Sequence, residues 1–172
     1  MGTKKGNTIM RTVYHGATLV ITSPLVHVGR SNLDFGEGFY VTDLKKQAQT
    51  WSMVKSRYIL DGTAYINEYL FDFENAIKEY RYKKFENYNY AWLHFIIDCR
   101  DGKNVWKDFD IIEGGVANDR VIDTIESFKA GQITEEKALT ELAKHQPNNQ
   151  ICILNQEVVD KYLHFRKYEI IT

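Results

Sequence analysis

The chain has 172 residues, of which 44% are hydrophobic and 26% charged, and its net charge at pH 7 is −1. This length fits one domain of roughly 100–200 residues, and the composition excludes a disordered chain. The near-zero charge excludes attraction of the whole surface to nucleic acid or to an acidic membrane. No apolar run approaches the roughly 18 residues of a membrane span, so we expect a soluble globular protein.

The chain shows one domain boundary, near its start. Residues 1–10 are polar and lack the apolar segment of a signal peptide, so we expect a flexible leader. Residues 11–172 contain two prolines and no Gly/Ser-rich linker, which predicts a single domain. Cys99 and Cys152 lie far apart and form no CxxC pair, and no histidine spacing suggests a ligand set, so no metal site is expected. Two buried, reduced thiols fit a cytoplasmic location.

In the N-terminal half, the pattern predicts short strands and one long helix. The segments expected to be extended are residues 11–14, 17–22, 39–42 and 63–73. Apolar residues recur at spacings of three and four over residues 44–59, which predicts an amphipathic helix with Asp43 as its N-cap. Gly62 is expected to break that helix.

In the C-terminal half, helices and strands alternate irregularly, which predicts an α+β fold. Helices are expected at about residues 88–100, from Val121 to Gly131, after an N-cap at Thr134, and at residues 156–163. Strands are expected at residues 108–113, 151–154 and 164–171. Gly131 suits the C′ position of a helix. Residues 151–154 are apolar on both faces, so their strand should be central in its sheet.

Three short motifs stand out after a search for common sites, because the chain has no Walker loop, no complete dinucleotide fingerprint and no HExxH. They are Tyr14-His15-Gly16 at the end of a strand, the double-glycine segment Asp34-Phe35-Gly36-Glu37-Gly38-Phe39-Tyr40, and Gln150 at the head of an apolar strand. Each alone has a structural explanation: a turn histidine, glycines for positive φ, a core tyrosine and a strand-end cap.

In this order the three motifs resemble the His-Tyr-Glu layout of the diphtheria-toxin-like ADP-ribosyltransferases, which include the poly(ADP-ribose) polymerases. The chain is also similar over nearly its whole length to a bacterial family known as domain of unknown function 3990. That second resemblance rests on Tyr14-His15-Gly16, Asp34 to Thr42, Trp92 to Phe95, Val116 to Arg120, and Gln150-Ile151. The resemblance to the ADP-ribosyltransferases implies split β-sheets with surrounding helices.

The resemblance to the transferases implies cleavage of the nicotinamide glycosidic bond of NAD⁺ and transfer of ADP-ribose to an acceptor. His15 would hydrogen-bond the adenosine ribose, and the backbone of Gly16 would pair with the nicotinamide amide. Tyr40 would stack on the nicotinamide ring, where an aromatic face suits a cationic pyridinium. By analogy the chain is a bacterial toxin or effector, with a neutralising antitoxin among its partners.

The chain departs from the family at one position, because Gln150 stands where the family has Glu. An amide can orient a ribose hydroxyl, but it cannot carry negative charge or act as a base. The resemblance therefore implies single transfer at best, and it implies that Gln150→Glu raises turnover.

Further candidates remain open between structure and function. Arg30 precedes the glycine motif and could clamp a pyrophosphate through its planar fork, or it could be a solvated loop residue. Trp51 follows Ala48 on the predicted helix and could form a second wall for nicotinamide, or it could belong to the core. Asn118, Asp119 and Arg120 suit a helix start that either caps the helix or also holds substrate.

Two rival functions remain open. The first is a catalytically silent module that binds NAD⁺ or another nucleotide, and the motivation is Gln150. The second is a protein-interaction domain, motivated by the 13% of aromatic residues, which could supply an interface.

Overall fold

The computed structural model describes residues 8–144 and 148–172. Most of the expected leader, residues 1–7, therefore lies outside the described residues. Thr8, Ile9 and Met10 have no regular secondary structure, and the side chain of Ile9 is 82% exposed. The first strand begins at Arg11, where the domain was expected to start.

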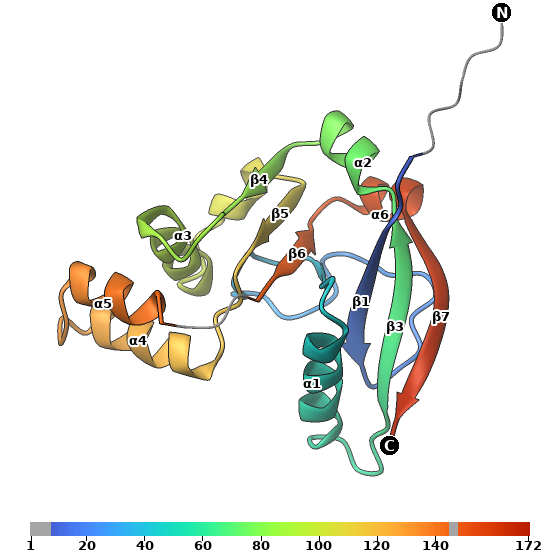
Figure 1. The fold of residues 1–172 in the computed structure, drawn as a ribbon, viewed down its shortest axis with the longest axis horizontal. Helices are drawn as coiled ribbons and strands as arrows, with labels where there is room; N and C mark the ends of the chain where they lie inside the picture. Colours follow the sequence, from blue (N-terminus) through green and yellow to red (C-terminus); the bar gives the residue numbers. More distant parts are fainter. Residues whose placement is uncertain (1–7, 145–147) are drawn as a thin grey trace, which may run out of the picture.

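Within residues 8–144 and 148–172, seven strands form two separate sheets (Figure 1). The first sheet has the order β1–β3–β7, with β1 at Arg11–Ala17, β3 at Ala64–Phe71 and β7 at Leu163–Ile171. The second sheet has the order β2–β6–β5–β4, with β2 at Phe39–Val41, β6 at Gln150–Ile153, β5 at Ile111–Gly114 and β4 at Tyr82–Lys84. Among the strand pairs of the described residues, only β4–β5 is parallel.

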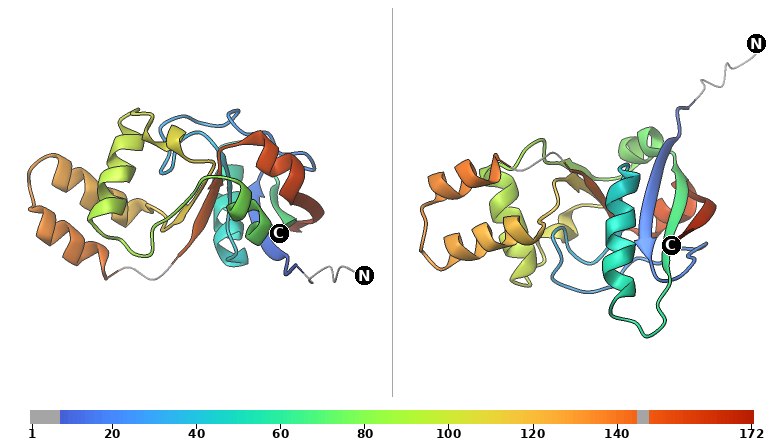
Figure 2. Two further views of the ribbon diagram at one scale, coloured as in Figure 1. Left: turned by 90° about the horizontal axis from the view of Figure 1, so that it is seen from above. Right: turned by 60° about the horizontal axis from the view of Figure 1, so that its bottom comes forward.

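Helices surround both sheets, which confirms the α+β class. The α-helices are α1 (Lys45–Ser56), α2 (Phe73–Glu79), α3 (Tyr90–Arg100), α4 (Asp119–Lys129), α5 (Glu135–Leu142) and α6 (Gln156–Tyr162). A short 3₁₀ helix, η1, spans Val105–Asp108. Helix α1 lies beside β1, while α3, α4 and α5 lie on the side of the second sheet that faces away from the first (Figures 1 and 2).

One backbone bridge joins β1 to the segment that follows β2. Tyr14 and Thr42 exchange two hydrogen bonds, from Tyr14 N to Thr42 O at 2.7 Å and from Thr42 N to Tyr14 O at 2.9 Å. Beyond this bridge the strands separate into their own sheets. The split between the sheets therefore begins beside His15.

The second sheet separates two hydrophobic cores because side chains alternate across a strand. Ile151 and Ile153 of β6 pack into the core between the two sheets, whereas Cys152 and Leu154 pack into the core under α3, α4 and α5. Strand β6 lies between β2 and β5, so the expectation of a central strand is confirmed.

Two local expectations were wrong. Asp43 does not cap α1, because the N-cap residue is Leu44 and the hydroxyl of Thr42 accepts the Leu44 N–H at 3.1 Å. Residues 18–22 are not a strand. The side chain of Asn67 on β3 holds them instead, since it accepts from Ile21 N at 2.9 Å and donates to Leu19 O at 3.0 Å.

Candidate functional site

His15 lies at the start of the split and is tied to the second sheet. Its Nδ1 lies 2.6 Å from Tyr40 O, and its ring stacks on Phe39 with a centroid distance of 4.3 Å. A carbonyl can only accept, so Nδ1 carries the proton and Nε2 is left as an acceptor. Burial, followed by the charge of Lys55, lowers the pKa of His15 to about 3. The imidazole is therefore neutral and offers a lone pair.

Gly16 faces the split with its backbone. Because Tyr14 directs its N–H and C=O toward Thr42, and alternate residues of a strand point the same way, the N–H and C=O of Gly16 also point to this edge of β1. The Gly16 carbonyl accepts from Lys55 Nζ at 2.8 Å. A Cβ on Gly16 would lie 2.0 Å from Ala48 O, so only glycine lets α1 approach β1 this closely.

Tyr40 is held by the glycine turn that precedes it. Its hydroxyl donates to Gly36 O at 2.6 Å and accepts from Phe35 N at 3.0 Å. Gly36 has φ of +90°, and a Cβ there would meet the Trp106 ring, so this turn requires glycine. Burial of the phenol, followed by the nearby Cys152 and Asp34, raises the pKa of Tyr40 well above its ordinary value. The half-buried ring is thus fixed and uncharged.

Gln150 is the first residue of β6 and is 3% exposed. Its Nε2 donates to Asp34 Oδ2 at 2.9 Å and to Gly115 O at 3.2 Å. Tyr40 pairs with Cys152, so Tyr40 and Gln150 lie on the same face of the second sheet, two residues apart in register. Both side chains are bonded to the turn formed by residues 34–36.

Arg30 and Trp51, two of the predicted ligand contacts, come from the loop after β1 and from α1. Arg30 is exposed in the long loop between β1 and β2. Desolvation, followed by the charge of Arg30, lowers the pKa of Lys55. Trp51 is half-buried on α1, and no hydrogen bond or ring contact of its side chain is found among the described residues.

A polar side chain caps the N-terminus of α4. Asn118 is the N-cap of α4, and its side chain accepts from Val121 N at 3.1 Å. Asp119 lies in the first turn, where a negative charge favours the helix dipole, and Arg120 is exposed. The preceding Ala117 N donates to Asp34 Oδ2 at 2.9 Å. The cap therefore lies close to the residues that hold Gln150.

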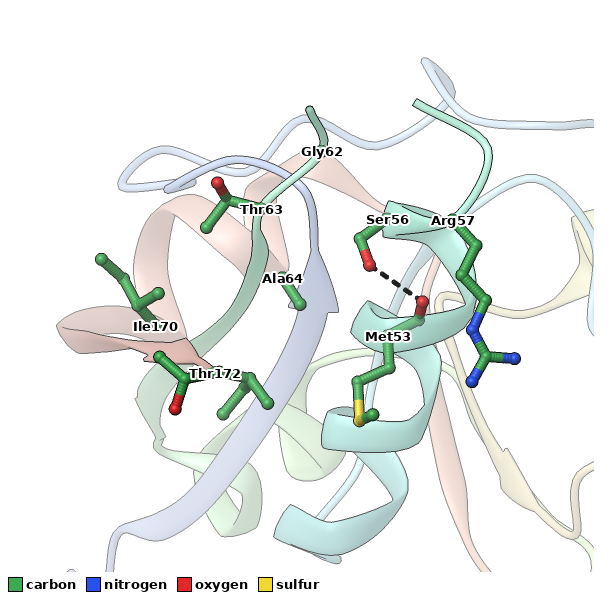
Figure 3. A pocket seen from close by; sticks show the side chains of 9 residues that line it. Met53, Ser56, Arg57, Gly62, Thr63, Ala64, Ile170 and Thr172 are labelled. Atoms are coloured by element: carbon green, nitrogen blue, oxygen red, sulfur yellow. Dashed lines mark hydrogen bonds between the residues drawn. The ribbon is translucent and has the colours of Figure 1, made fainter. Parts of the chain in front are cut away.

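Two hollows in the surface lie outside this cluster. One of about 380 Å³ lies between the end of α1 and the ends of β3 and β7, with Met53 and Ser56 on one side and Ile170 and Thr172 on the other (Figure 3). The second, of about 520 Å³, is lined by residues that include His27, Arg81 and Trp106. Neither is lined by His15, Tyr40 or Gln150.

The structure brings His15, Gly16, Tyr40 and Gln150 to one region around the split, and it adds residues that the sequence did not single out for a role. Lys55 lies on α1 in line with Ser52 and Ala48, one and two turns away, and this helical spacing is the signal that could have found it. Asp34 and Arg100 hold Gln150 and are 66 residues apart in sequence. No sequence pattern links them.

The described ranges contain no helix that is long and apolar enough to cross a bilayer. Within the same ranges, no group of three or more His, Cys, Asp or Glu is placed to hold a metal ion.

Comparison with known proteins gives one match. No curated protein and no solved structure matches the chain. The model of one protein family, described as "Protein of unknown function (DUF3990)", matches residues 11–165. That range includes every residue of the cluster around the split and nearly the whole described domain. The chain therefore belongs to the DUF3990 family.

Proposed function

We propose that this protein is an NAD⁺-dependent mono-ADP-ribosyltransferase. The observation that carries the proposal is the way in which the sheets separate. Beyond the antiparallel bridge between Tyr14 and Thr42, Gly16 on β1 and Tyr40 on β2 lie on the two sides of the point where the sheets separate. The backbone edge of a glycine together with a fixed aromatic ring suits a flat amide-bearing ring such as nicotinamide.

The other residues of the cluster support complementary roles. Because Nδ1–H is bonded to Tyr40 O, the free Nε2 of His15 can accept a hydrogen bond from a ribose hydroxyl. The Gly16 carbonyl accepts from Lys55 Nζ, and the proposal has the nicotinamide amide replace Lys55 as its donor. The released ammonium and Arg30 then suit the diphosphate of NAD⁺. With two cations at the site, binding of the diphosphate does not require a basic surface over the whole protein, which agrees with the net charge of −1.

The proposed reaction breaks the bond between C1′ of the ribose and the nitrogen of nicotinamide. The bonding electrons leave with the ring, which departs as neutral nicotinamide, and the acceptor's nucleophile forms a new bond to C1′ and loses its proton. The centre at C1′ resembles an oxocarbenium ion, so positioning and electrostatics supply the catalysis. Because Gln150 cannot act as a base, the acceptor must lose its proton without help from this residue.

The cellular setting proposed with this activity is the bacterial cytoplasm. Cys99 and Cys152 are both free and buried, and burial raises the pKa of the Cys99 thiol to about 12, as suits inert thiols in a reducing compartment. As a toxin or effector, the protein would modify a macromolecule or small molecule and require a neutralising antitoxin in the cell that makes it.

The test is incubation of the protein with labelled NAD⁺ and a cell lysate. We expect release of nicotinamide and transfer of label to an acceptor. Tyr40→Ala should lower the release by about 10-fold or more, since a cation–π contact is worth up to about 2 kcal/mol. Tyr58→Ala is the matched control, because Tyr58 is 85% exposed on the loop after α1. Equal rates for the wild type and Tyr40→Ala would overturn the proposed role.

A second candidate function is a silent NAD⁺-binding module, which is favoured by the amide of Gln150 in place of a carboxylate. This candidate keeps the pocket and lacks turnover. Calorimetry separates the two functions, because binding of NAD⁺ without release of nicotinamide supports the silent module. Absence of binding would exclude both.

A further inference from the structure

Asp34 is a buried carboxylate that receives four hydrogen bonds. The fork of Arg100 donates to Oδ1 from Nε at 3.0 Å and from Nη2 at 2.5 Å. The other oxygen, Oδ2, accepts from Ala117 N at 2.9 Å and from Gln150 Nε2 at 2.9 Å. Asp34 is 6% exposed, so Arg100 supplies the positive charge that a buried carboxylate needs.

These contacts fix the orientation of the Gln150 amide. Both partners of Nε2, the carboxylate of Asp34 and the carbonyl of Gly115, can only accept, so the NH₂ group must point at them. No donor among the described residues is bonded to Gln150 Oε1. Asp72 Oδ1 is the one buried side-chain oxygen or nitrogen in the described ranges without a partner, so Gln150 Oε1 still reaches solvent.

From these contacts we propose that Asp34, clamped by Arg100, is the positioning residue that turns the oxygen of Gln150 outward as a neutral acceptor for the nicotinamide-ribose hydroxyl. The inference rests on the proposed transfer of ADP-ribose and names how that site works without its carboxylate. Gln150 touches the substrate, whereas Asp34 and Arg100 act through it. The segment at Gly115 contributes the second fixed acceptor.

The same geometry explains why this chain has glutamine at position 150. A glutamate carboxylate there would lie about where Nε2 now lies, against Asp34 Oδ2. Two buried carboxylates in contact repel each other when both are ionised, and a proton held by one of them removes the repulsion. Asp34 is paired with Arg100, so the carboxyl group of the introduced glutamate would hold the proton or displace Asp34. We therefore propose that Gln150→Glu lowers turnover, the opposite of what the resemblance to the transferases implies.

The first experiment measures nicotinamide release by Gln150→Glu between pH 6 and pH 8. At pH 8 we expect the rate to fall at least about 10-fold below wild type, which corresponds to one lost hydrogen bond of about 1.4 kcal/mol. The rate should recover toward pH 6, because the shared proton removes the repulsion. A rate at pH 8 equal to or above the wild type overturns the proposal. Asp34→Asn combined with Gln150→Glu should abolish the pH dependence.

The second experiment leaves Gln150 in place and compares two arginine–aspartate pairs. Arg81 binds Asp110 through the same two nitrogens, from Nε to Oδ2 at 3.0 Å and from Nη2 to Oδ1 at 3.1 Å, without a contact to Gln150. We expect Arg100→Lys to lower kcat about 10-fold, equivalent to about 1.4 kcal/mol in the barrier, while KM for NAD⁺ changes little. Arg81→Lys should leave both constants unchanged. Equal effects of the two variants would reduce Arg100 to a structural role and overturn the proposal.

Failure of the proposed function gives a different result. Without nicotinamide release by the wild type, ADP-ribosyl transfer is excluded and so is the role of Gln150 in it. Unfolding of Gln150→Glu as a function of pH then still reports the contact: greater destabilisation at pH 8 than at pH 6 supports the Asp34 pairing. A destabilisation that does not depend on pH would contradict the pairing itself.

Discussion

His15 shows how a neighbouring carbonyl decides the chemistry of an imidazole. The bond from Nδ1 to Tyr40 O assigns the tautomer, and burial keeps the ring neutral. The sequence indicated that His15 lies at a strand end, but it could not indicate which nitrogen remains free. That property depends on Tyr40, which is 25 residues away.

The low pKa of His15 predicts a pH dependence of stability. Between the ordinary pKa of 6.5 and the folded value of about 3, the unfolded chain binds a proton that the folded protein does not, so stability rises with pH over this window. The slope reaches at most about 1.4 kcal/mol per pH unit. His15→Gln should flatten this part of the profile in urea unfolding experiments.

The control for this experiment is His164→Gln, which changes an exposed residue of β7. This variant should keep the slope of the wild type. If His15→Gln and the wild type lose stability in parallel between pH 6.5 and pH 3, the low pKa of His15 is contradicted.

Gly16 predicts a sharper effect on packing. A methyl group at this position would lie 2.0 Å from Ala48 O and 2.8 Å from Ser52 N, and both are backbone atoms of α1. Helix and strand must separate, so Gly16→Ala should cost about 1–3 kcal/mol in urea unfolding. Gly29→Ala is the matched control, because nothing lies within 4 Å of its added Cβ, and it should stay within about 0.5 kcal/mol of wild type.

At the scale of elements, the ends of the helices were predicted best where a residue acts on its own backbone. Thr134 caps α5 and accepts from Lys137 N, and Gly131 has φ of +72° after α4, so both expectations are confirmed. The expected cap at Asp43 was wrong because the N-cap residue is Leu44, which has no capping side chain, and the buried hydroxyl of Thr42 accepts the Leu44 N–H. Local sequence cannot show which of two adjacent polar residues turns inward.

Contacts between residues far apart in the sequence determine the features that the sequence did not predict. Residues 18–22 have β-branched side chains typical of a strand, but Asn67 binds their backbone in a loop. The set of Asp34, Arg100 and Gln150 spans 116 residues between its ends. Motifs identified three parts of the candidate site, whereas the residues that orient those parts became visible only with the fold.

The N-cap of α4 gives a prediction that separates capping from substrate binding. Asn118→Ala should cost about 1 kcal/mol in stability, because Val121 N loses its acceptor. Asn118→Asp should keep the cap and the stability, since a carboxylate accepts the same bond and favours the helix dipole. The measurement is urea unfolding of both variants together with nicotinamide release. A loss of release in Asn118→Asp at unchanged stability would assign Asn118 to substrate.

At the scale of the whole molecule, the two sheets meet at one hydrogen-bonded bridge of the described backbone, Tyr14 with Thr42. The residues proposed to bind NAD⁺ come from both sides of this bridge. A ligand that contacts both sides therefore adds a second connection between the sheets, and its binding free energy appears as stability of the whole domain.

Thermal unfolding measures this connection. NAD⁺ at about 100 times its Kd should add roughly 2.7 kcal/mol of stability, which for a domain of this size raises Tm by about 5–10 °C. Tyr58→Ala should show the same rise as wild type, while Tyr40→Ala should show a smaller one. An unchanged Tm at millimolar NAD⁺ would leave the protein-interaction domain as the surviving function.

The order of the strands also sets when the two sheets can form during synthesis. Strand β3 is flanked by β1 and by β7 at Leu163–Ile171, and β6 at Gln150–Ile153 separates β2 from β5. Until the ribosome has released the segment from Gln150 to Ile171, β2 has no partner on its sheet and β3 has a bare edge. A nascent chain that ends before Gln150 lacks β6, and one that ends before Leu163 lacks β7, the second neighbour of β3. The cell that makes the protein is therefore exposed to the proposed activity only after translation has passed β7.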